Sequence, residues 1–311
     1  MDVEEIFPGV FELRMEYGRD TAGLLTDGAF PHAVWYIAGP TPALLDPGPT
    51  VVAQETLRTL RELGYDPNDI EYVIPSHIHV DHGGGSGWLV RELPNAKAVF
   101  HTRGVPYMTD ITKLAEGTRQ VFGNEWEEVF GELLPVPEDR VVAVEEGFRL
   151  QLGGRPYRIV FMPGHSLDHI SVYDETNEAL YSGHGLGNFM PHRWMPDPPM
   201  TLPYFDVAAS IESIRHARDL NPRYLLPAHT GFLAANPAFA IDSVERVTTE
   251  LGDLIQAGMR DGLTLDTMEE QVRVYFFAKP DKADRSYLPT VQAYVNYYER
   301  QTRRRQEGNR K

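Results

Sequence analysis

The sequence contains no cysteine, which excludes disulfide bonds, thiolate metal sites and a cysteine nucleophile. It also lacks any apolar run near the roughly 18 residues that a membrane-spanning helix needs. Basic residues are scarce: 29 Lys and Arg stand against 45 Asp and Glu, so the formal net charge is −16. Because such a chain repels phosphate backbones, nucleic acid is not the expected partner. The first residues are acidic and lack the basic-then-apolar pattern of a signal peptide, so we expect a cytoplasmic protein that is not bound to a membrane.

The composition is typical of a folded globular protein: of 311 residues, 42% are hydrophobic and 24% are charged. Short runs of Val, Leu, Tyr and Phe between turn signals predict strands. These are Gly9–Met15, His32–Ile37, Ala43–Leu45, Tyr72–Ile74, Ala98–His101, the hairpins Phe148–Leu152 with Tyr157–Phe161 and Ile170–Tyr173 with Ala179–Tyr181, and Tyr224–Leu226. Apolar spacing of three and four predicts helices at Val51–Leu63 and Phe205–Leu220, and residues 104–131 are predicted to be helical with breaks.

The residues after 235 follow a helical pattern throughout. Ile241, Val244 and Val247 begin an apolar stripe with spacings of three and four. Asp266 and Glu269 predict a capping box at the start of a further helix. We therefore expect a domain at 1–235 and a helical segment at 236–311, and leave open a homodimer formed through this segment.

Three histidines and one aspartate fall within six residues, His77-Ile78-His79-Val80-Asp81-His82. Imidazole is the commonest neutral metal ligand in proteins and suits zinc and iron. The His-x-His spacing in an extended loop points both rings the same way. Asp81 and His82 then turn off that line and could serve a second ion. Glycines follow directly and allow a tight backbone turn, so the pattern predicts a metal centre.

Together with later motifs, this cluster resembles the metallo-β-lactamase superfamily. The matching marks are Leu45-Asp46-Pro47-Gly48, the cluster within Ser76–Gly84, Pro163-Gly164-His165-Ser166, Tyr181-Ser182-Gly183-His184 and Pro227-Ala228-His229. The resemblance implies an α/β fold: a four-layer αββα sandwich with the metals at one edge of its two sheets, here with a C-terminal helical appendage. It also implies two sets of metal ligands, His77, His79 and His165 for a first ion and Asp81, His82 and His229 for a second.

One position departs from the family's pattern. Where members usually carry an aspartate that bridges two metals, this sequence has His184. A carboxylate has two oxygens that can join two ions, whereas a neutral imidazole offers one lone pair. Either His184 binds one metal only, or the second site is altered or empty. The alternative for the residue itself is that it has lost the ligand role.

Several other residues have predicted roles near the metals. Asp46 resembles the aspartate that supports the metal loop, because an imidazole ligand needs its other nitrogen fixed. Asp81 is the predicted catalytic residue, since it could both bind a metal and orient the nucleophile. The Pro-rich loop 185–205 is either a covering loop or a substrate wall, and its His192 and Trp194 are the predicted substrate contacts. Weaker claims attach to His32, His101 and His216, and His169 is interpreted as a structural histidine.

The expected chemistry is hydrolysis. Metal coordination lowers the pKa of bound water enough to make hydroxide available near pH 7. We therefore expect a metal-dependent hydrolase that uses a metal-bound hydroxide on an ester, thioester, lactone or related bond of a small molecule. One or two zinc ions are the expected cofactor, with iron or manganese as alternatives. Because histidine sites also hold iron, the alternative function is a mono- or di-iron, oxygenase-like redox enzyme on the same fold.

Overall fold

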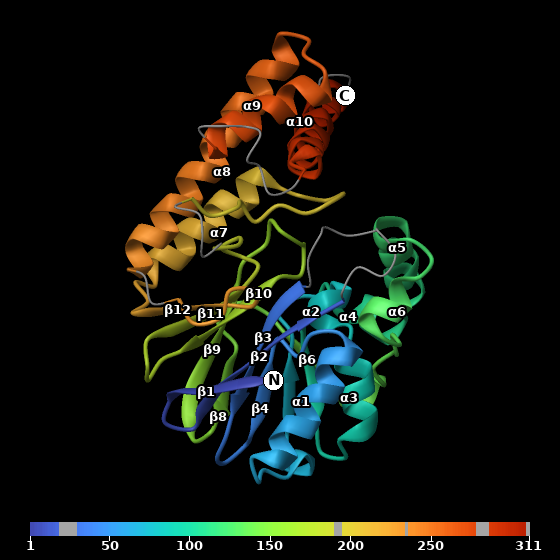
Figure 1. Cartoon of the computed structure of the whole chain (residues 1–311), viewed down its shortest axis with the longest axis vertical. Helices are drawn as coiled ribbons and strands as arrows, with labels where there is room; N and C mark the ends of the chain where they lie inside the picture. Colours follow the sequence, from blue (N-terminus) through green and yellow to red (C-terminus); the bar gives the residue numbers. More distant parts are fainter. Residues whose placement is uncertain (19–29, 190–194, 234–235, 278–285, 309–311) are drawn as a thin grey trace. The chain divides into compact units, whose positions relative to one another are not determined.

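The computed structural model describes residues 1–18, 30–189, 195–233, 236–277 and 286–308 (Figure 1). The chain divides into two compact units. The first, here called the sandwich unit, comprises Met1–Phe161, Leu167–His184 and Pro222–Pro237. The second, the helical unit, comprises Met162–Ser166, Gly185–Asn221 and Ala238–Lys311. The predicted domains 1–235 and 236–311 remain a prediction.

The sandwich unit is built on two β-sheets. The larger has its described strands in sequence order: β1 (Asp2–Phe7), β2 (Val10–Tyr17), β3 (Phe30–Ile37), β4 (Ala43–Leu45), β5 (Tyr72–Ile74), β6 (Lys97–His101) and β7 (Val141–Val144). The smaller has the order β12-β11-β10-β9-β8, with bounds β8 (Arg149–Leu152), β9 (Arg155–Phe161), β10 (Ile170–Asp174), β11 (Ala179–Gly183) and β12 (Tyr224–Pro227). Each predicted strand and both predicted hairpins are confirmed, and β4 and β5 match residue for residue.

Alternation along β3 explains why this strand is buried on both faces. Ala33, Trp35 and Ile37 point into a core that they share with Tyr157 and other residues of the smaller sheet, so the two sheets pack face to face. Val34 and Tyr36 point the other way, into a core shared with helices. Successive side chains of a strand lie on opposite faces, and β3 is apolar on both, as a central strand needs to be.

Helices cover the outer face of the larger sheet, where Leu57 of α1 and Phe130 of α6 join the core of Val34 (Figure 1). Their bounds are α1 (Thr50–Glu62), α2 (Val80–Gly83), α3 (Ser86–Glu92), α4 (Val105–Thr109), α5 (Thr112–Phe122) and α6 (Trp126–Phe130), with short 3₁₀ turns at Pro67–Asp69 and Glu138–Arg140. The predicted breaks within 104–131 are confirmed. Gly123 and Gly131 end α5 and α6 with positive φ angles of 82° and 81°, which favour glycine.

Two strands were not predicted, β1 and β7. β1 is acidic and mostly exposed, and among the described strands it pairs only with β2, at the edge of the sheet. β7 is four residues long, and of the described strands only β6 pairs with it. Edge strands bury little, so their sequences carry a weak alternation signal.

The helical unit contains α7 (Val207–Asp219), α8 (Pro237–Arg260), α9 (Leu265–Phe276) and α10 (Leu288–Gly308). The expectation of a helical C-terminal region is confirmed. Its core brings Phe205 and Val207 together with Leu251 of α8, Val272 of α9 and Tyr294 of α10. Within the described residues, none of the helices combines the length and the apolar character needed to cross a membrane.

The predicted capping box at Asp266 and Glu269 is wrong. The residue before α9 is Thr264, whose Oγ1 accepts the backbone N–H of Thr267. The helix therefore starts two residues earlier than the motif indicated. Glu269 instead binds the segment that leads into α10: its Oε1 accepts from Ser286 Oγ and from the Tyr287 N–H, both at 2.8 Å.

We expect Glu269→Ala to lower the free energy of unfolding at pH 7 by about 1–3 kcal/mol, because the buried Tyr287 loses a hydrogen-bond acceptor. Partial burial acts to raise the pKa of Glu269, but the hydrogen bonds from Ser286, Tyr287 and Arg273 outweigh it and lower the pKa below 4.5. Since the folded-state pKa is lowered, the contribution is present above pH 4.5 and is lost as the pH falls through the lowered value.

Urea unfolding of wild type and variant at pH 7 and at progressively lower pH measures this difference. Glu270→Ala, which removes an exposed carboxylate one residue away, is the control. Equal stability of Glu269→Ala and wild type at pH 7 would contradict the assignment.

Candidate metal centre

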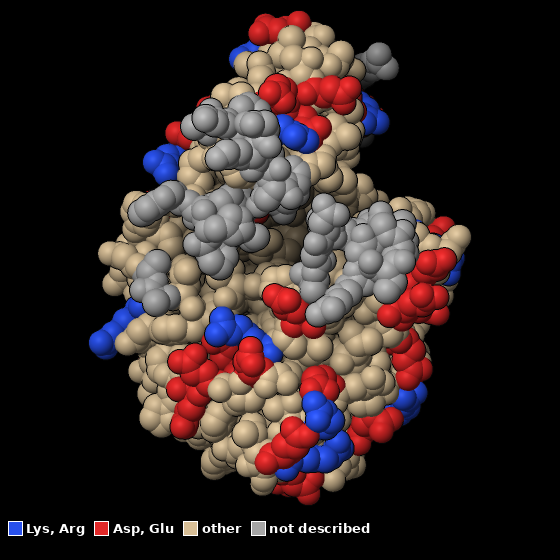
Figure 2. All heavy atoms as spheres, viewed as in Figure 1, with Lys and Arg blue, Asp and Glu red and all other residues tan. Residues whose placement is uncertain are grey.

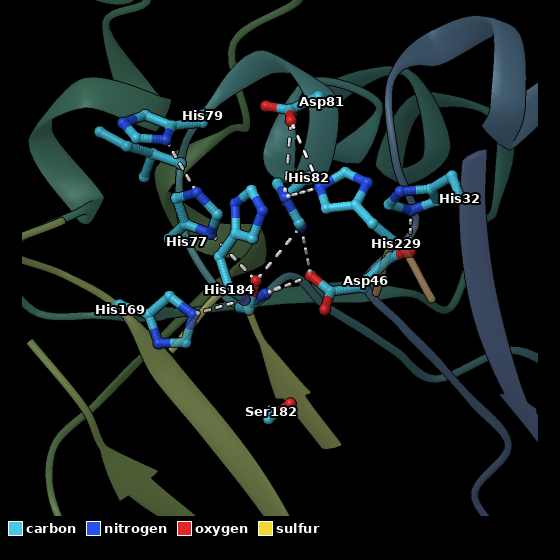
Figure 3. Close-up of polar contacts among 12 residues, drawn as sticks. His32, Asp46, His77, His79, Asp81, His82, His169, Ser182, His184 and His229 are labelled. Carbon is cyan, nitrogen blue, oxygen red and sulfur yellow. Dashed lines mark hydrogen bonds and ion pairs between the residues drawn. The ribbon is translucent and has the colours of Figure 1, made fainter. Parts of the chain in front are cut away.

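Four strands of the sandwich unit end near one place, and each is followed by candidate residues (Figure 3). Asp46 follows β4, the segment His77–His82 follows β5, His184 follows β11 and His229 follows β12. Because β4 and β5 are parallel, as are β11 and β12, the carboxyl ends of each pair lie at the same edge. The topology thus gathers residues that are far apart in the sequence.

The two histidines of the His-x-His spacing meet directly. His77 Nε2 lies 2.8 Å from His79 Nδ1. Between them, the backbone N–H of Ile78 donates a hydrogen bond to Asp168 Oδ2 at 3.0 Å, which fixes the loop. The helix α2 that follows packs closely on this backbone, since a Cβ at Gly83 would lie only 2.8 Å from the carbonyl oxygen of His77.

Asp81, His82 and His229 form a compact set of donor atoms. His82 Nε2 and His229 Nε2 are 3.1 Å apart, and Asp81 Oδ2 lies 3.5 Å from the first and 3.7 Å from the second. Ligands at about 2.1 Å from a tetrahedral zinc ion lie about 3.4 Å from one another. The spacing and the chemistry of these donors therefore fit a divalent metal.

Hydrogen bonds fix the two imidazoles of this set from behind. His82 Nδ1–H donates to Asp46 Oδ1 at 3.2 Å, and His229 Nδ1–H donates to the carbonyl oxygen of Pro31 at 2.9 Å. Each Nδ1 carries the proton because its partner can only accept, so each Nε2 presents a lone pair to the shared position. Asp46 is itself held by the backbone N–H of Ser76 at 2.8 Å.

His184 lies between the two predicted ligand sets. One ligand atom each of His77, His82 and His184 falls within 4.8 Å of the others. Its ring centroid is 4.5 Å from that of His229 and 5.2 Å from that of His82, but 6.3 Å from that of His77. Its backbone N–H donates to His169 Nε2 at 3.1 Å. The imidazole thus lies nearer to the second set.

Sequence reasoning missed or underrated three residues that touch this centre. Ser76 Oγ is 3.0 Å from His77 Nδ1 and 3.4 Å from His82 Nδ1, so one hydroxyl contacts a histidine of each set. His32, given a weaker claim, is buried, donates from Nε2 to the Asp46 carbonyl oxygen and stacks edge-on against His82. Asp168 had no role at all. Only Ser76 had a signal, its place directly before the motif.

The electrostatics of the centre suit a cation. Burial lowers the pKa of His79 from 6.5 to about 4, and burial together with His82 lowers the pKa of His229. Burial also acts to lower the pKa of His82, but the carboxylates of Asp81 and Asp46 outweigh it and raise the pKa. His79 and His229 are therefore neutral near pH 7, the form that binds metal, and two negative charges face the position beside His82.

The candidate ligands differ in their exposure to solvent. His77 and His82 are buried, whereas the side chains of Asp81 and His229 keep 21% and 11% exposure and His79 and His184 are also partly exposed. Structural metal sites are fully enclosed, while catalytic sites keep a position for water or substrate. The arrangement therefore suits a reactive metal.

The roles of three other predicted site residues remain predictions. His165 belongs to the segment Met162–Ser166 of the helical unit, where the Asp206 N–H donates to the Gly164 carbonyl oxygen, and its ligand role remains a prediction. His192 and Trp194 lie outside the described residues.

Comparison with known proteins identifies relatives of this chain. A metallo-β-lactamase-fold protein of Sulfurisphaera tokodaii is 27% identical over 168 residues, and an acyl-coenzyme A thioesterase of Gallus gallus is 28% identical over 177 residues. These matches cover 53% and 55% of this chain but only 62% and 60% of the relatives. A solved metallo-β-lactamase family protein of Thermus thermophilus has a TM-score of 0.68 at 18% identity, covering 96% of this chain and 95% of its own. That likeness confirms the predicted αββα fold.

A family model provides the last comparison. The model of the metallo-beta-lactamase superfamily matches residues 27–229, which is 203 of the 311 residues and spans both predicted ligand sets. The position of the candidate ligands at the strand ends and the close pairs of imidazoles agree with this match. The chain belongs to the metallo-β-lactamase superfamily.

Proposed function

We propose that this protein is a metal-dependent hydrolase of small molecules with an ester, thioester, lactone or related bond. The observation that carries the proposal is the set Asp81, His82 and His229, whose donor atoms lie 3.1–3.7 Å apart with both imidazoles fixed from behind. A divalent ion bound there would supply Lewis acidity and a hydroxide nucleophile near neutral pH. The name of the Gallus gallus relative supports testing a thioester.

The residues of the chain take distinct parts in this reaction. His82 and His229 would hold the ion with their Nε2 atoms, while Asp46 and the Pro31 carbonyl hold the two rings. Asp81 would hold the same ion and could accept a proton from the attacking water. His77, His79 and His165 would hold the first ion, as the family resemblance implies.

The substrate we propose is small and is not a nucleic acid. Acidic side chains occupy the visible surface around α5 and α6 of the sandwich unit, and the chain as a whole carries −16 (Figure 2). Such a surface repels polyphosphates. The Met and aromatic residues of loop 185–205, with His192 and Trp194, support an apolar acyl or aryl portion.

Metal analysis of the purified protein, with turnover of a p-nitrophenyl ester, an acyl thioester and a lactone, tests the function. We expect zinc, hydrolysis of at least one substrate, and loss of both on dialysis against a chelator. Bound iron together with substrate-dependent oxygen uptake and no hydrolysis would favour the redox alternative instead.

We expect His184→Asp to raise the occupancy of the second ion. A carboxylate between two dications neutralises part of their repulsion, whereas the imidazole of His184 in wild type carries no negative charge. Metal stoichiometry of the two proteins in the same chelator-buffered solution measures the effect, and His184→Ala separates a missing imidazole from an added charge. Two fully occupied ions in wild type and fewer in His184→Asp would contradict this argument.

A further inference from the structure

The turn that carries His229 is attached to β2 and β3 of the larger sheet at three points. The Ala33 N–H of β3 donates to the Ala228 carbonyl oxygen at 2.7 Å, and His229 Nδ1 donates to the Pro31 carbonyl oxygen at 2.9 Å. The third bond runs from the Phe232 N–H to Glu12 Oε1 of β2, at 3.1 Å. On the strand side, the first two bonds use backbone atoms, and Glu12 alone contributes a side chain.

Glu12 is an unusual residue to find in this place. It is only 1% exposed, on a strand whose other acid, Glu16, faces solvent. Its carboxylate forms an ion pair with Arg14, whose Nε lies 3.5 Å away and whose side chain is half exposed. Burial acts to raise the pKa of the carboxyl group, the direction expected when a charge is removed from water. Burying a carboxylate costs free energy, so we ask what the polar contacts of Glu12 contribute besides packing.

The contact between Glu12 and the turn is close. Gly231, next to the bonded Phe232, has φ +77°, and a Cβ there would lie 1.8 Å from Glu12 Oε1. The Gly231 N–H also closes the turn onto the Pro227 carbonyl oxygen at 2.9 Å. The carboxylate therefore contacts a part of the turn that only glycine fits, and along the turn His229 lies between this contact and the bond from Ala33 to Ala228.

We propose that Glu12 is a positioning residue for the second metal: it clamps the far end of the 227–232 turn and so holds His229 at the position it shares with Asp81 and His82. This proposal rests on the proposed function, because it requires an ion at those three residues. Glu12 touches neither ion nor substrate and acts through His229.

The test compares the affinity of the second ion in wild type, Glu12→Ala, Glu12→Gln and Glu16→Ala, by competition with a chromophoric zinc chelator. Asp81→Ala identifies which binding event belongs to the second set. We expect Glu12→Ala to bind the second ion about 10- to 100-fold more weakly, the usual effect of losing a group that orients a ligand. Glu12→Gln keeps an acceptor oxygen for Phe232, so its affinity for the second ion is expected to lie within about threefold of the wild-type value. Glu16→Ala is expected to have the wild-type affinity.

A second variant reaches the clamp from the other side. Gly231→Ala places a methyl group against Glu12 Oε1, and we expect the same selective loss of the second ion with the first ion retained. If Glu12 had a merely structural role, both variants would instead have a lower unfolding temperature than wild type without metal, and both would bind the first and the second ion more weakly. That result, or equal affinities in wild type and Glu12→Ala, would overturn the role of Glu12 alone. A wild type that binds no ion lost in Asp81→Ala would overturn the proposed function and this proposal together.

Discussion

His82→Ala is expected to remove the second ion and to lower kcat/KM for hydrolysis at least about a thousandfold, equivalent to about 4 kcal/mol. We expect an effect of this size because the His82 ring makes several contacts in the candidate centre. His82 Nε2 faces both His229 and Asp81, and its Nδ1 donates to Asp46. Its loss removes a ligand and leaves a buried carboxylate without its imidazole partner.

Metal content by mass spectrometry and steady-state kinetics measure both effects. His101→Ala is the matched control, because His101 is also buried in the sandwich unit but belongs to none of the candidate metal groups among the described residues. Full second-site occupancy in His82→Ala with turnover within tenfold of wild type would show that the assignment is wrong.

The second large effect is expected from His79→Ala, which should remove the first ion and abolish measurable turnover. His79 Nδ1 lies 2.8 Å from His77 Nε2, so a ligand atom of each imidazole is within reach of one cation. Because His79 is neutral near pH 7, the substitution changes no charge, and a loss of metal reports on the ligand itself.

His216→Ala, a change at another partly buried histidine, in α7, is the control for this variant. The first ion is measured by zinc titration of the chelator-treated proteins. If His79→Ala retains both ions and full turnover, the ligand role of His79 is refuted, whatever the effect of His82→Ala.

The parts of the fold that sequence predicts well are those that many contacts determine together. β4 and β5 are short, but turns bound both, and their apolar side chains serve two cores. β1 was not predicted because an acidic edge strand forms its backbone hydrogen bonds while burying few side chains. The capping box failed because Thr264 and Asp266 are both competent caps, and local sequence does not say which competing hydrogen bond Glu269 will find.

The candidate centre shows the same division. The clustered histidines are visible because the metal-binding spacing is local. His32 is not, because its contact with the Asp46 carbonyl depends on how β3 lies beside β4, a matter of register. Glu12 is harder still, since an acid in an alternating strand is normally read as a solvent-facing residue. Residues that orient ligands are found in space, by hydrogen bonds across strands, and seldom by spacing.

The chain order of the helical unit has a consequence during synthesis. Phe205 and Val207 emerge from the ribosome before α8, α9 and α10 exist, yet their apolar neighbours Val247 and Tyr294 lie on α8 and α10. Arg300 of α10 also donates to the Phe205 carbonyl oxygen. Until α8 and α10 are translated, Phe205 and Val207 lack these native neighbours. A ribosome that pauses after α7 would therefore hold a nascent chain that is prone to aggregate and in need of a chaperone.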